Sequence, residues 1–205
     1  QTEIIFDGGS IVASGDGHIV DEMPYFKESQ RSYVLSDILS AKGDTLNPKD
    51  KIELIHDAIV LGIKDYFGKL GFKKAILGLS GGIDSAVTMA LAARALGPEN
   101  VRVLLMPSQY SSDHSVNDAV ALAENLGSPY DIIAIKDIYD VFMDKLSPIF
   151  GDLPFNVAEE NIQARSRGIL NMAISNKFGN ILLNTTNKSE MAVGYGTLYG
   201  DLCGG

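Results

Sequence analysis

The chain has 205 residues, of which 45% are hydrophobic and 21% charged, and its 17 Lys and Arg against 26 Asp and Glu give a net charge of −9. This composition is that of an ordinary globular protein with one domain and room for a fragment of another. The acidic charge disfavours a nucleic-acid partner, no apolar run is long enough for a membrane span, and a single cysteine, Cys203, excludes a disulfide framework and suits the reducing cytoplasm.

The sequence of residues 1–35 predicts short strands that are separated by turns. β-prone runs flank the glycine-rich segments 7–9 and 14–17, and Asp-Gly between such runs is a hairpin signal. Without a periodic helix, this segment cannot build a sheet core of its own. We expect it to be the remnant of a separate domain, joined by a linker over residues 36–47.

A long helix is predicted from Pro48, because proline suits the first helical turn and apolar residues follow at helical spacing as far as Leu70. Gly71 should end this helix. We take residues 48–205 as one domain that begins with it.

Beyond Gly71, strands alternate with helices. Strands are expected over residues 75–79, 101–106, 132–135 and 181–183. Helices are expected over residues 86–96, 113–126, 138–150 and 157–178. The strands are continuously apolar, which is typical of a parallel sheet covered by helices on both faces. The sequence predicts a doubly wound α/β fold, in which ligands bind at the carboxyl ends of the strands.

The loop 80–85 joins the first of these strands to a helix. Gly81 and Gly82 let the backbone approach an anion, and the helix N-terminus offers unpaired N–H groups and a partial positive charge. The loop has neither the lysine of a Walker motif nor the dinucleotide-binding spacing. Its carboxylate, Asp84, would repel a polyphosphate unless a divalent cation lay between them, so the loop predicts phosphate together with Mg²⁺. The alternative is a tight turn in which Asp84 or Ser85 only caps the helix.

Two further polar segments are candidates for the site. Asn161 and Arg165 are four residues apart and share one helix face, although a solvated helix surface would look the same. The segment 184–190 follows a strand, where site residues gather in this fold class. Glu190 could equally sit in a first helical turn for its dipole, and Asp201 in a glycine-rich turn.

The string Ser-Gly-Gly-Ile-Asp-Ser at residues 80–85 resembles the phosphate loop of the ATP pyrophosphatases, enzymes that cleave ATP between its α and β phosphorus atoms. With Asn-Ile-Gln-Ala-Arg at 161–165, Thr-Thr-Asn-Lys-Ser-Glu at 185–190 and Tyr-Gly-Asp at 199–201, the chain resembles the NAD synthetases over residues 49–205.

The resemblance implies a role for each matching position. The residues implied at ATP are Gly78, Leu79, Ser80, Gly81, Gly82, Ile83, Ser85, Met106 and Thr185, with Ser80, Gly82 and Ser85 on the departing pyrophosphate. Asn161, Arg165 and Glu190 would contact deamido-NAD (nicotinic acid adenine dinucleotide). The catalytic residues implied are Asp84, Glu190 and Asp201, the first two as Mg²⁺ ligands and Asp201 near the substrate and ammonia. Leu198 stands where the ammonia-dependent branch would have a lysine.

The activity that the resemblance implies is ATP-dependent amidation of deamido-NAD to NAD through an acyl-adenylate, with release of AMP and pyrophosphate and with ammonia supplied free or from glutamine. It also implies a homodimer. The opening 1–35 resembles the end of a nitrilase-type glutaminase domain, and the family continues beyond Gly205, so we expect a piece of a longer enzyme. Cys203 does not match the glutaminase nucleophile and should be a small buried or incidental thiol. The alternatives are another ATP pyrophosphatase, such as GMP synthetase or a tRNA-modifying enzyme, and a nucleotide-binding module without catalysis.

Overall fold

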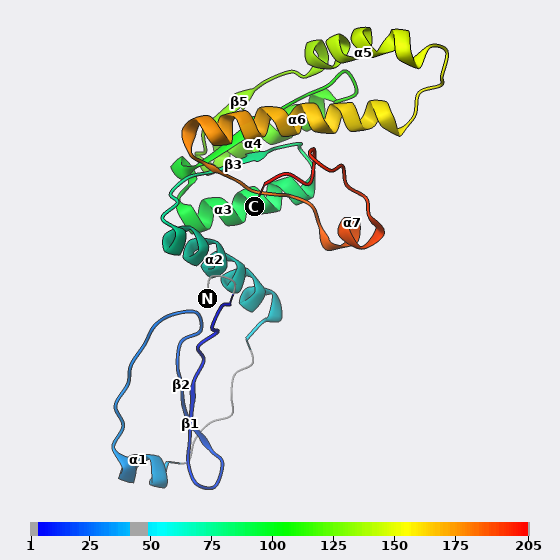
Figure 1. Cartoon of the computed structure of the whole chain (residues 1–205). Coiled ribbons are helices and arrows are strands. Elements are labelled where there is room, and N and C mark those ends of the chain that lie inside the picture. Colours follow the sequence, from blue (N-terminus) through cyan, green and yellow to red (C-terminus); the bar gives the residue numbers. More distant parts are fainter. Residues whose placement is uncertain (1–3, 42–48, 205) are drawn as a thin grey trace. The chain divides into compact units, whose positions relative to one another are not determined.

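The computed structural model describes residues 4–41 and 49–204, so Pro48 and residues 42–47 of the expected linker lie outside the described residues. The chain divides into two compact units, Gln1–Lys69 and Leu70–Gly205 (Figure 1). Within the described ranges, no helix combines the length and the apolar character that a membrane span requires.

The first unit contains an antiparallel hairpin of β1 (Ile11–Ala13) and β2 (Ile19–Glu22). Its turn is closed by Ser14, whose N–H donates to the carbonyl of His18 over 2.8 Å, so the hairpin predicted at 14–17 is confirmed. The hairpin signal at 7–9 is wrong. There Gly8, with φ of 71°, forms an isolated antiparallel bridge to Tyr25 instead of a turn between two strands.

Two helices complete this unit, α1 (Leu35–Ser40) and α2 (Lys51–Leu70). The six-residue α1 begins at Leu35 and runs into the segment 36–47 that the sequence assigns to a linker, and no side chain caps it. The start of α2 is stabilised by Asp50, whose Oδ1 accepts a hydrogen bond from the N–H of Ile52 over 2.7 Å. The predicted end is confirmed, since Gly71 follows with φ of 77°.

The second unit is built on a four-stranded parallel sheet in the order β5-β4-β3-β6. The strands are β3 (Ala75–Gly78), β4 (Val101–Leu105), β5 (Tyr130–Ile132) and β6 (Ile181–Leu182). β5 begins two residues earlier than expected, because Tyr130 already pairs with Val103, whereas the buried Ile135 is the N-cap of the next helix. The parallel sheet itself is as predicted.

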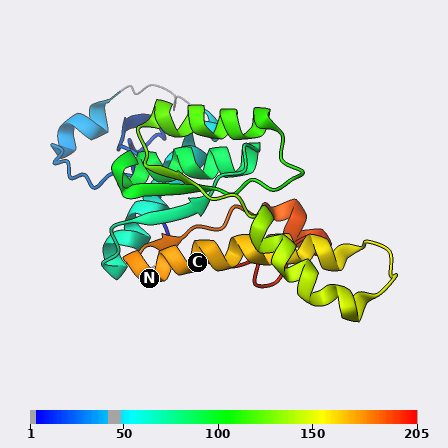
Figure 2. The ribbon, with the colours of Figure 1, turned by 90° about the horizontal axis from the view of Figure 1, so that it is seen from above.

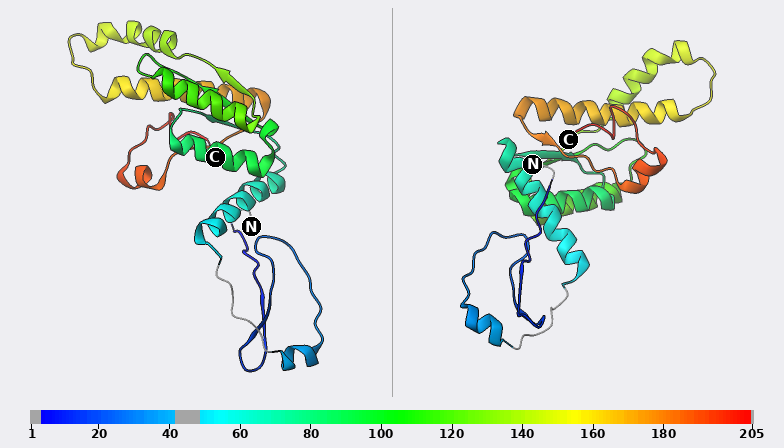
Figure 3. Two further views of the ribbon diagram at one scale, coloured as in Figure 1. Left: turned by 180° about the vertical axis from the view of Figure 1, so that it is seen from behind. Right: turned by 60° about the horizontal axis from the view of Figure 1, so that its bottom comes forward.

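Helices cover both faces of this sheet, which confirms the doubly wound fold. The helices of this unit are α3 (Ile83–Leu96), α4 (Asp113–Leu126), α5 (Lys136–Phe150), α6 (Val157–Phe178) and α7 (Lys188–Val193), with a 3₁₀ turn η1 (Pro98–Asn100) before β4. α3 and α4 lie together on one face and α6 on the other (Figure 2). α5 runs beside α6 as a helical pair (Figure 3).

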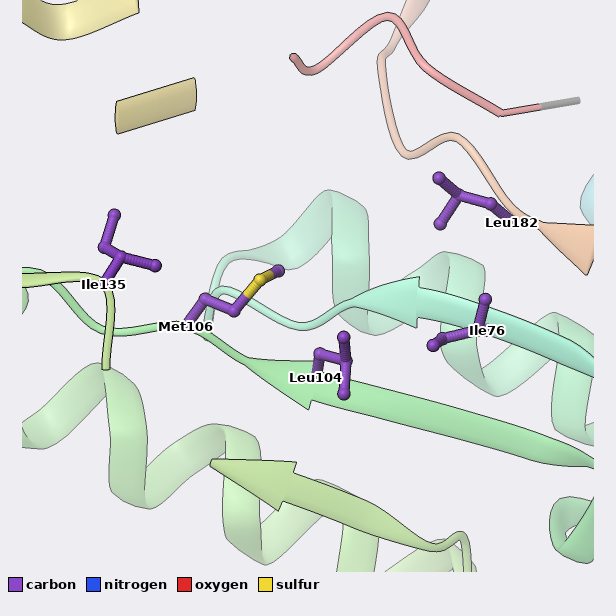
Figure 4. Packing of buried hydrophobic residues seen from close by; sticks show 5 residues of the cluster. All are labelled: Ile76, Leu104, Met106, Ile135 and Leu182. Atoms are coloured by element: carbon purple, nitrogen blue, oxygen red, sulfur yellow. The ribbon is translucent and has the colours of Figure 1, made fainter. Parts of the chain in front are cut away.

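Part of the core lies between the sheet and α6. It joins Ile76, Leu104, Met106, Ile135 and Leu182, none of which is more than 8% exposed (Figure 4). These five side chains come from β3, the β4 strand and its end, the start of α5, and β6, so their packing ties consecutive strands together.

The strand order indicates where a ligand crevice opens in this sheet. The chain leaves β3 for β4 and β5 on one side and later returns to β6 on the other side. β3 and β6 are therefore the neighbours at which the strand order reverses, and a crevice opens beyond the carboxyl ends of such a pair. The loops that follow these two strands are 79–82 and 183–187.

Candidate active site

A cavity of about 430 Å³ opens at this point of the sheet. It collects ten of the predicted site residues from four separate stretches of chain. They are Gly78, Leu79, Ser80, Gly82, Asp84, Ser85, Met106, Thr185, Glu190 and Asp201. Gly81, Ile83, Asn161 and Arg165 do not line it.

The phosphate loop is shaped by its two serines. The hydroxyl of Ser80 accepts the N–H of Gly82 over 3.1 Å, and the hydroxyl of Ser85 accepts the N–H of Ser80 over 3.2 Å. Ser85 also donates to the carbonyl of Gly82 over 3.0 Å. These bonds curl the loop back over the start of α3, whose first-turn N–H groups have no intrahelical acceptor. These first-turn N–H groups lie at the positive end of the helix, which suits an anion.

The carboxylate of Asp84 is free to meet a ligand. Asp84 lies in the first turn of α3, is exposed, lines the cavity, and accepts no hydrogen bond from a described residue. The N-cap of α3 is Gly82, and no side chain caps the helix. The alternative reading, in which Asp84 or Ser85 only caps the helix, is therefore wrong.

Glu190 caps a helix and also lines the cavity. It is the third residue of α7 and forms a capping box with Asn187: its Oε2 accepts the N–H of Asn187 over 3.0 Å, and the Asn187 side chain accepts its N–H over 2.9 Å. The same half-buried side chain lines the cavity. One carboxylate oxygen holds the helix start, and Oε1 accepts no hydrogen bond from a described residue.

Asp201 reaches the cavity because the glycine-rich segment before it packs closely on α6. A Cβ atom at Gly200 would lie 2.9 Å from the carbonyl carbon of Ala164, and one at Gly168 would lie 2.7 Å from the oxygen of Tyr199. The carbonyl of Asp201 also accepts a hydrogen bond of 3.0 Å from Nδ2 of Asn184, which joins this segment to the end of β6.

Asn161 and Arg165 share a helix face as predicted, and both contact the same segment. Thr197 Oγ1 donates to Oδ1 of Asn161 over 2.7 Å, and Nε of Arg165 donates to the carbonyl of Leu198 over 3.2 Å. Asn161 and Arg165 thus bind the segment that precedes Asp201, and they do not line the cavity. Their contact with deamido-NAD stays a prediction.

Among the residues that line the cavity without an expected role in the site are Arg167, Asn171 and Cys203. Nε of Arg167 donates to the carbonyl of Met106 over 3.1 Å. Oδ1 of Asn171 is buried without a hydrogen-bond partner. The available signal was the spacing of Arg167 and Asn171, four residues apart on α6, which places both on one face of that helix.

The charge in the cavity is mostly negative. Asp84, Glu190 and Asp201 supply carboxylates, and Arg167 is the one cationic side chain among the described residues that line it. Burial lowers the pKa of the Arg167 guanidinium below its ordinary value, and the charge of Asp201 offsets only part of this effect. Burial raises the pKa of the Cys203 thiol, whose Sγ donates to the carbonyl of Gly200 over 2.8 Å, in agreement with an inert thiol.

The described residues contain no group of three or more His, Cys, Asp or Glu side chains arranged to hold a metal ion. This excludes a cation cage built wholly from those side chains.

Comparison with known proteins gives consistent matches. The family model described as NAD synthase matches residues 55–205. A glutamine-dependent NAD(+) synthetase of Synechocystis is 53% identical over 99% of this chain and 37% of its own length. The chain thus spans a little over a third of such curated relatives.

Solved structures give the same result. A glutamine-dependent NAD+ synthetase from Acinetobacter baumannii, in complex with ADP, matches with a TM-score of 0.89 at 43% identity, over 98% of this chain and 38% of that one. An NH3-dependent NAD synthetase from Campylobacter jejuni matches with a TM-score of 0.68 at 36% identity, over 76% of this chain and 66% of that one. By its cavity, its phosphate loop and these matches, the chain belongs to the NAD synthase family.

Proposed function

We propose that this chain carries the ATP-dependent amidation of deamido-NAD to NAD, through an acyl-adenylate, with release of AMP and pyrophosphate. The observation that carries the proposal is the opening of the Asp84 phosphate loop into the same cavity as Thr185, Glu190 and Asp201. Membership of the family, and a related structure that contains ADP, support ATP as the nucleotide.

The backbone of the phosphate loop would bind the β- and γ-phosphates. Its first-turn N–H groups point at the anion and need no reorganisation when pyrophosphate leaves, which is how preorganised donors accelerate such a step. Asp84 and the free oxygen of Glu190 would hold Mg²⁺, which supplies charge neutralisation on the departing pyrophosphate when bound.

The rest of the cavity would position the acceptor. A carboxylate cannot exchange its oxygen for ammonia directly, because oxide or hydroxide would have to leave. Attack of the substrate carboxylate on the α-phosphorus converts that oxygen into part of AMP, a good leaving group. The Asp201 carboxylate would accept hydrogen bonds from the ammonia that then displaces AMP. The protein contributes mainly position and electrostatics.

We further propose that residues 1–35 are the end of a nitrilase-type glutaminase domain, with ammonia produced from glutamine by the preceding part of that domain. The naming of the relatives as glutamine-dependent supports this. A homodimer and a cytoplasmic location are proposed on the family resemblance and on the single cysteine. Light scattering on the complete protein tests the dimer.

The activity is tested with the complete protein. It is incubated with ATP, Mg²⁺, ammonium ions and either deamido-NAD or XMP, and the products are separated by chromatography. We expect AMP, pyrophosphate and NAD in equal amounts. Release of ADP would reject the pyrophosphatase mechanism, amidation of XMP alone would favour a GMP synthetase, and nucleotide binding without turnover would favour a binding module.

A further inference from the structure

Arg167 presents a cation to the cavity from a fixed position. It lies on α6, is half-buried, and its Nε is held by the carbonyl of Met106 at the end of β4. A guanidinium has five N–H donors in a planar fork, so this bond leaves the four donors of its Nη atoms. Within the described ranges these donors form no ion pair and no further hydrogen bond.

The proposed reaction brings ATP and a substrate carboxylate, both anions, into a cavity that has little positive charge of its own. ATP and the substrate carboxylate must meet in a cavity lined by three carboxylates. The amides of the loop and a metal at Asp84 serve the pyrophosphate end of ATP. The α-phosphate and the attacking carboxylate would need a further cation, and Arg167 is the one described cationic side chain of the cavity.

The position of Arg167 suits this second task. Its anchor, Met106, is a residue expected at ATP, and the charge of Asp201, expected near the substrate, acts on its guanidinium. Arg167 therefore contacts one residue that is expected on the nucleotide side and feels the charge of another that is expected on the acceptor side. The α-phosphorus, which joins nucleotide and acceptor in the acyl-adenylate, would then lie within reach of the Arg167 guanidinium.

We propose that Arg167 donates hydrogen bonds from its Nη atoms to the α-phosphate of ATP and to the carboxylate oxygen that attacks it. The inference rests on the proposed function. In this step the carboxylate oxygen forms a bond to the α-phosphorus while the bond from that phosphorus to the bridging oxygen of pyrophosphate breaks. The bridging oxygen keeps the electron pair, and Arg167 remains protonated throughout.

The test compares Arg167→Gln and Arg167→Lys with Arg102→Gln in the complete protein. Arg102 is a matched control because its Nε also makes one structural hydrogen bond, of 2.6 Å, to Asp131 between β4 and β5, and it does not line the cavity. Initial rates of pyrophosphate release that depend on deamido-NAD give kcat and the KM for ATP. Melting temperatures are recorded for each variant.

We expect Arg167→Gln to lower kcat by about 100-fold or more, with the KM for ATP changed by less than about 3-fold, because the lost contact matters most in the transition state. Arg167→Lys should recover about 10-fold relative to Gln, since lysine keeps the charge but not the planar fork. Arg102→Gln should keep the normal kcat.

A purely structural role would give a different result. It predicts equal loss in the Gln and Lys variants, in step with a lower melting temperature, and that outcome would overturn the inference. So would a kcat of Arg167→Gln within about 3-fold of the unmodified protein. Failure of the proposed function is distinguishable, because the unmodified protein would then release no pyrophosphate in response to deamido-NAD.

Discussion

The backbone of Gly81 lies against the carbonyl group of Ser115, so close that a Cβ atom at Gly81 would stand 2.3 Å from the Ser115 oxygen. Gly81 also has φ of 83°, a conformation that L side chains rarely adopt. The phosphate loop is therefore positioned by α4, an element that lies outside the loop motif in the sequence. Gly81 does not line the cavity, yet the shape of the loop depends on it.

We expect Gly81→Ala to displace the loop, to lower the melting temperature by more than about 5 °C, and to reduce pyrophosphate release by at least about 100-fold. Gly127→Ala is the matched control, because Gly127 has φ of 77° but nothing within 4 Å of its added Cβ. It should cost about 1 kcal/mol of stability from backbone strain and leave turnover unchanged. Equal behaviour of the two variants would show that the contact with Ser115 is unimportant.

Asp84→Asn should leave the fold intact and remove pyrophosphate formation. The Asp84 carboxylate accepts no hydrogen bond from a described residue, so the folded state loses little when its charge is removed. Initial rates as a function of Mg²⁺ concentration, together with melting temperatures, measure both effects. Asp113→Asn, in the first turn of α4, controls for the loss of one acidic charge at a helix start. A variant with near-normal turnover would remove the basis for a metal at Asp84.

The two roles of Glu190 can be separated by two substitutions. Glu190→Gln keeps an oxygen that can accept the N–H of Asn187 but removes the charge, whereas Glu190→Ala removes both. We expect the Gln variant to melt normally and to need more Mg²⁺ for the same rate. The Ala variant should also lose about 1 kcal/mol of stability. If the Gln variant has a normal Mg²⁺ requirement, Glu190 serves only as a helix cap.

Alkylation of Cys203 reports on the cavity. Because burial raises the pKa of this thiol, a smaller fraction is thiolate at about pH 8 than in a free cysteine, and native protein should react with iodoacetamide at least about 10-fold more slowly than protein in urea. ATP should slow the reaction further, because Cys203 lines the cavity. Mass spectrometry follows the modification. A native rate equal to the rate in urea would contradict the burial of this thiol.

The exact bounds of a helix could be predicted from the sequence where both of its ends carry a capping residue. The bounds of α4 and α6 are those expected, because Ser112 and Asn156 cap their starts and left-handed Gly127 and Gly179 end them. The edge strand β5 was misplaced, since its three residues are half or fully exposed and an apolar run at the next helix start resembles a strand.

The site was only partly predictable, and the reason is geometric. The residues of the motif 80–85 are adjacent in the sequence. By contrast, Asn161 and Arg165 contact residues that lie 36 and 33 positions away, respectively. The spacing of Arg167 from Asn171 indicates a shared helix face, but the contact of Arg167 with Met106 spans 61 residues. Such contacts are created by tertiary packing, and no local spacing records them.

The strand order also has a consequence for how the protein is made. One wall of the cavity follows β3, and the opposite wall comes from the segment 184–201, which a ribosome synthesises about a hundred residues later. The phosphate loop can therefore form on a nascent chain well before the far wall exists. The complete cavity therefore exists only after that late segment has docked, and the stabilisation that a ligand gains by contacting both walls comes only at that stage.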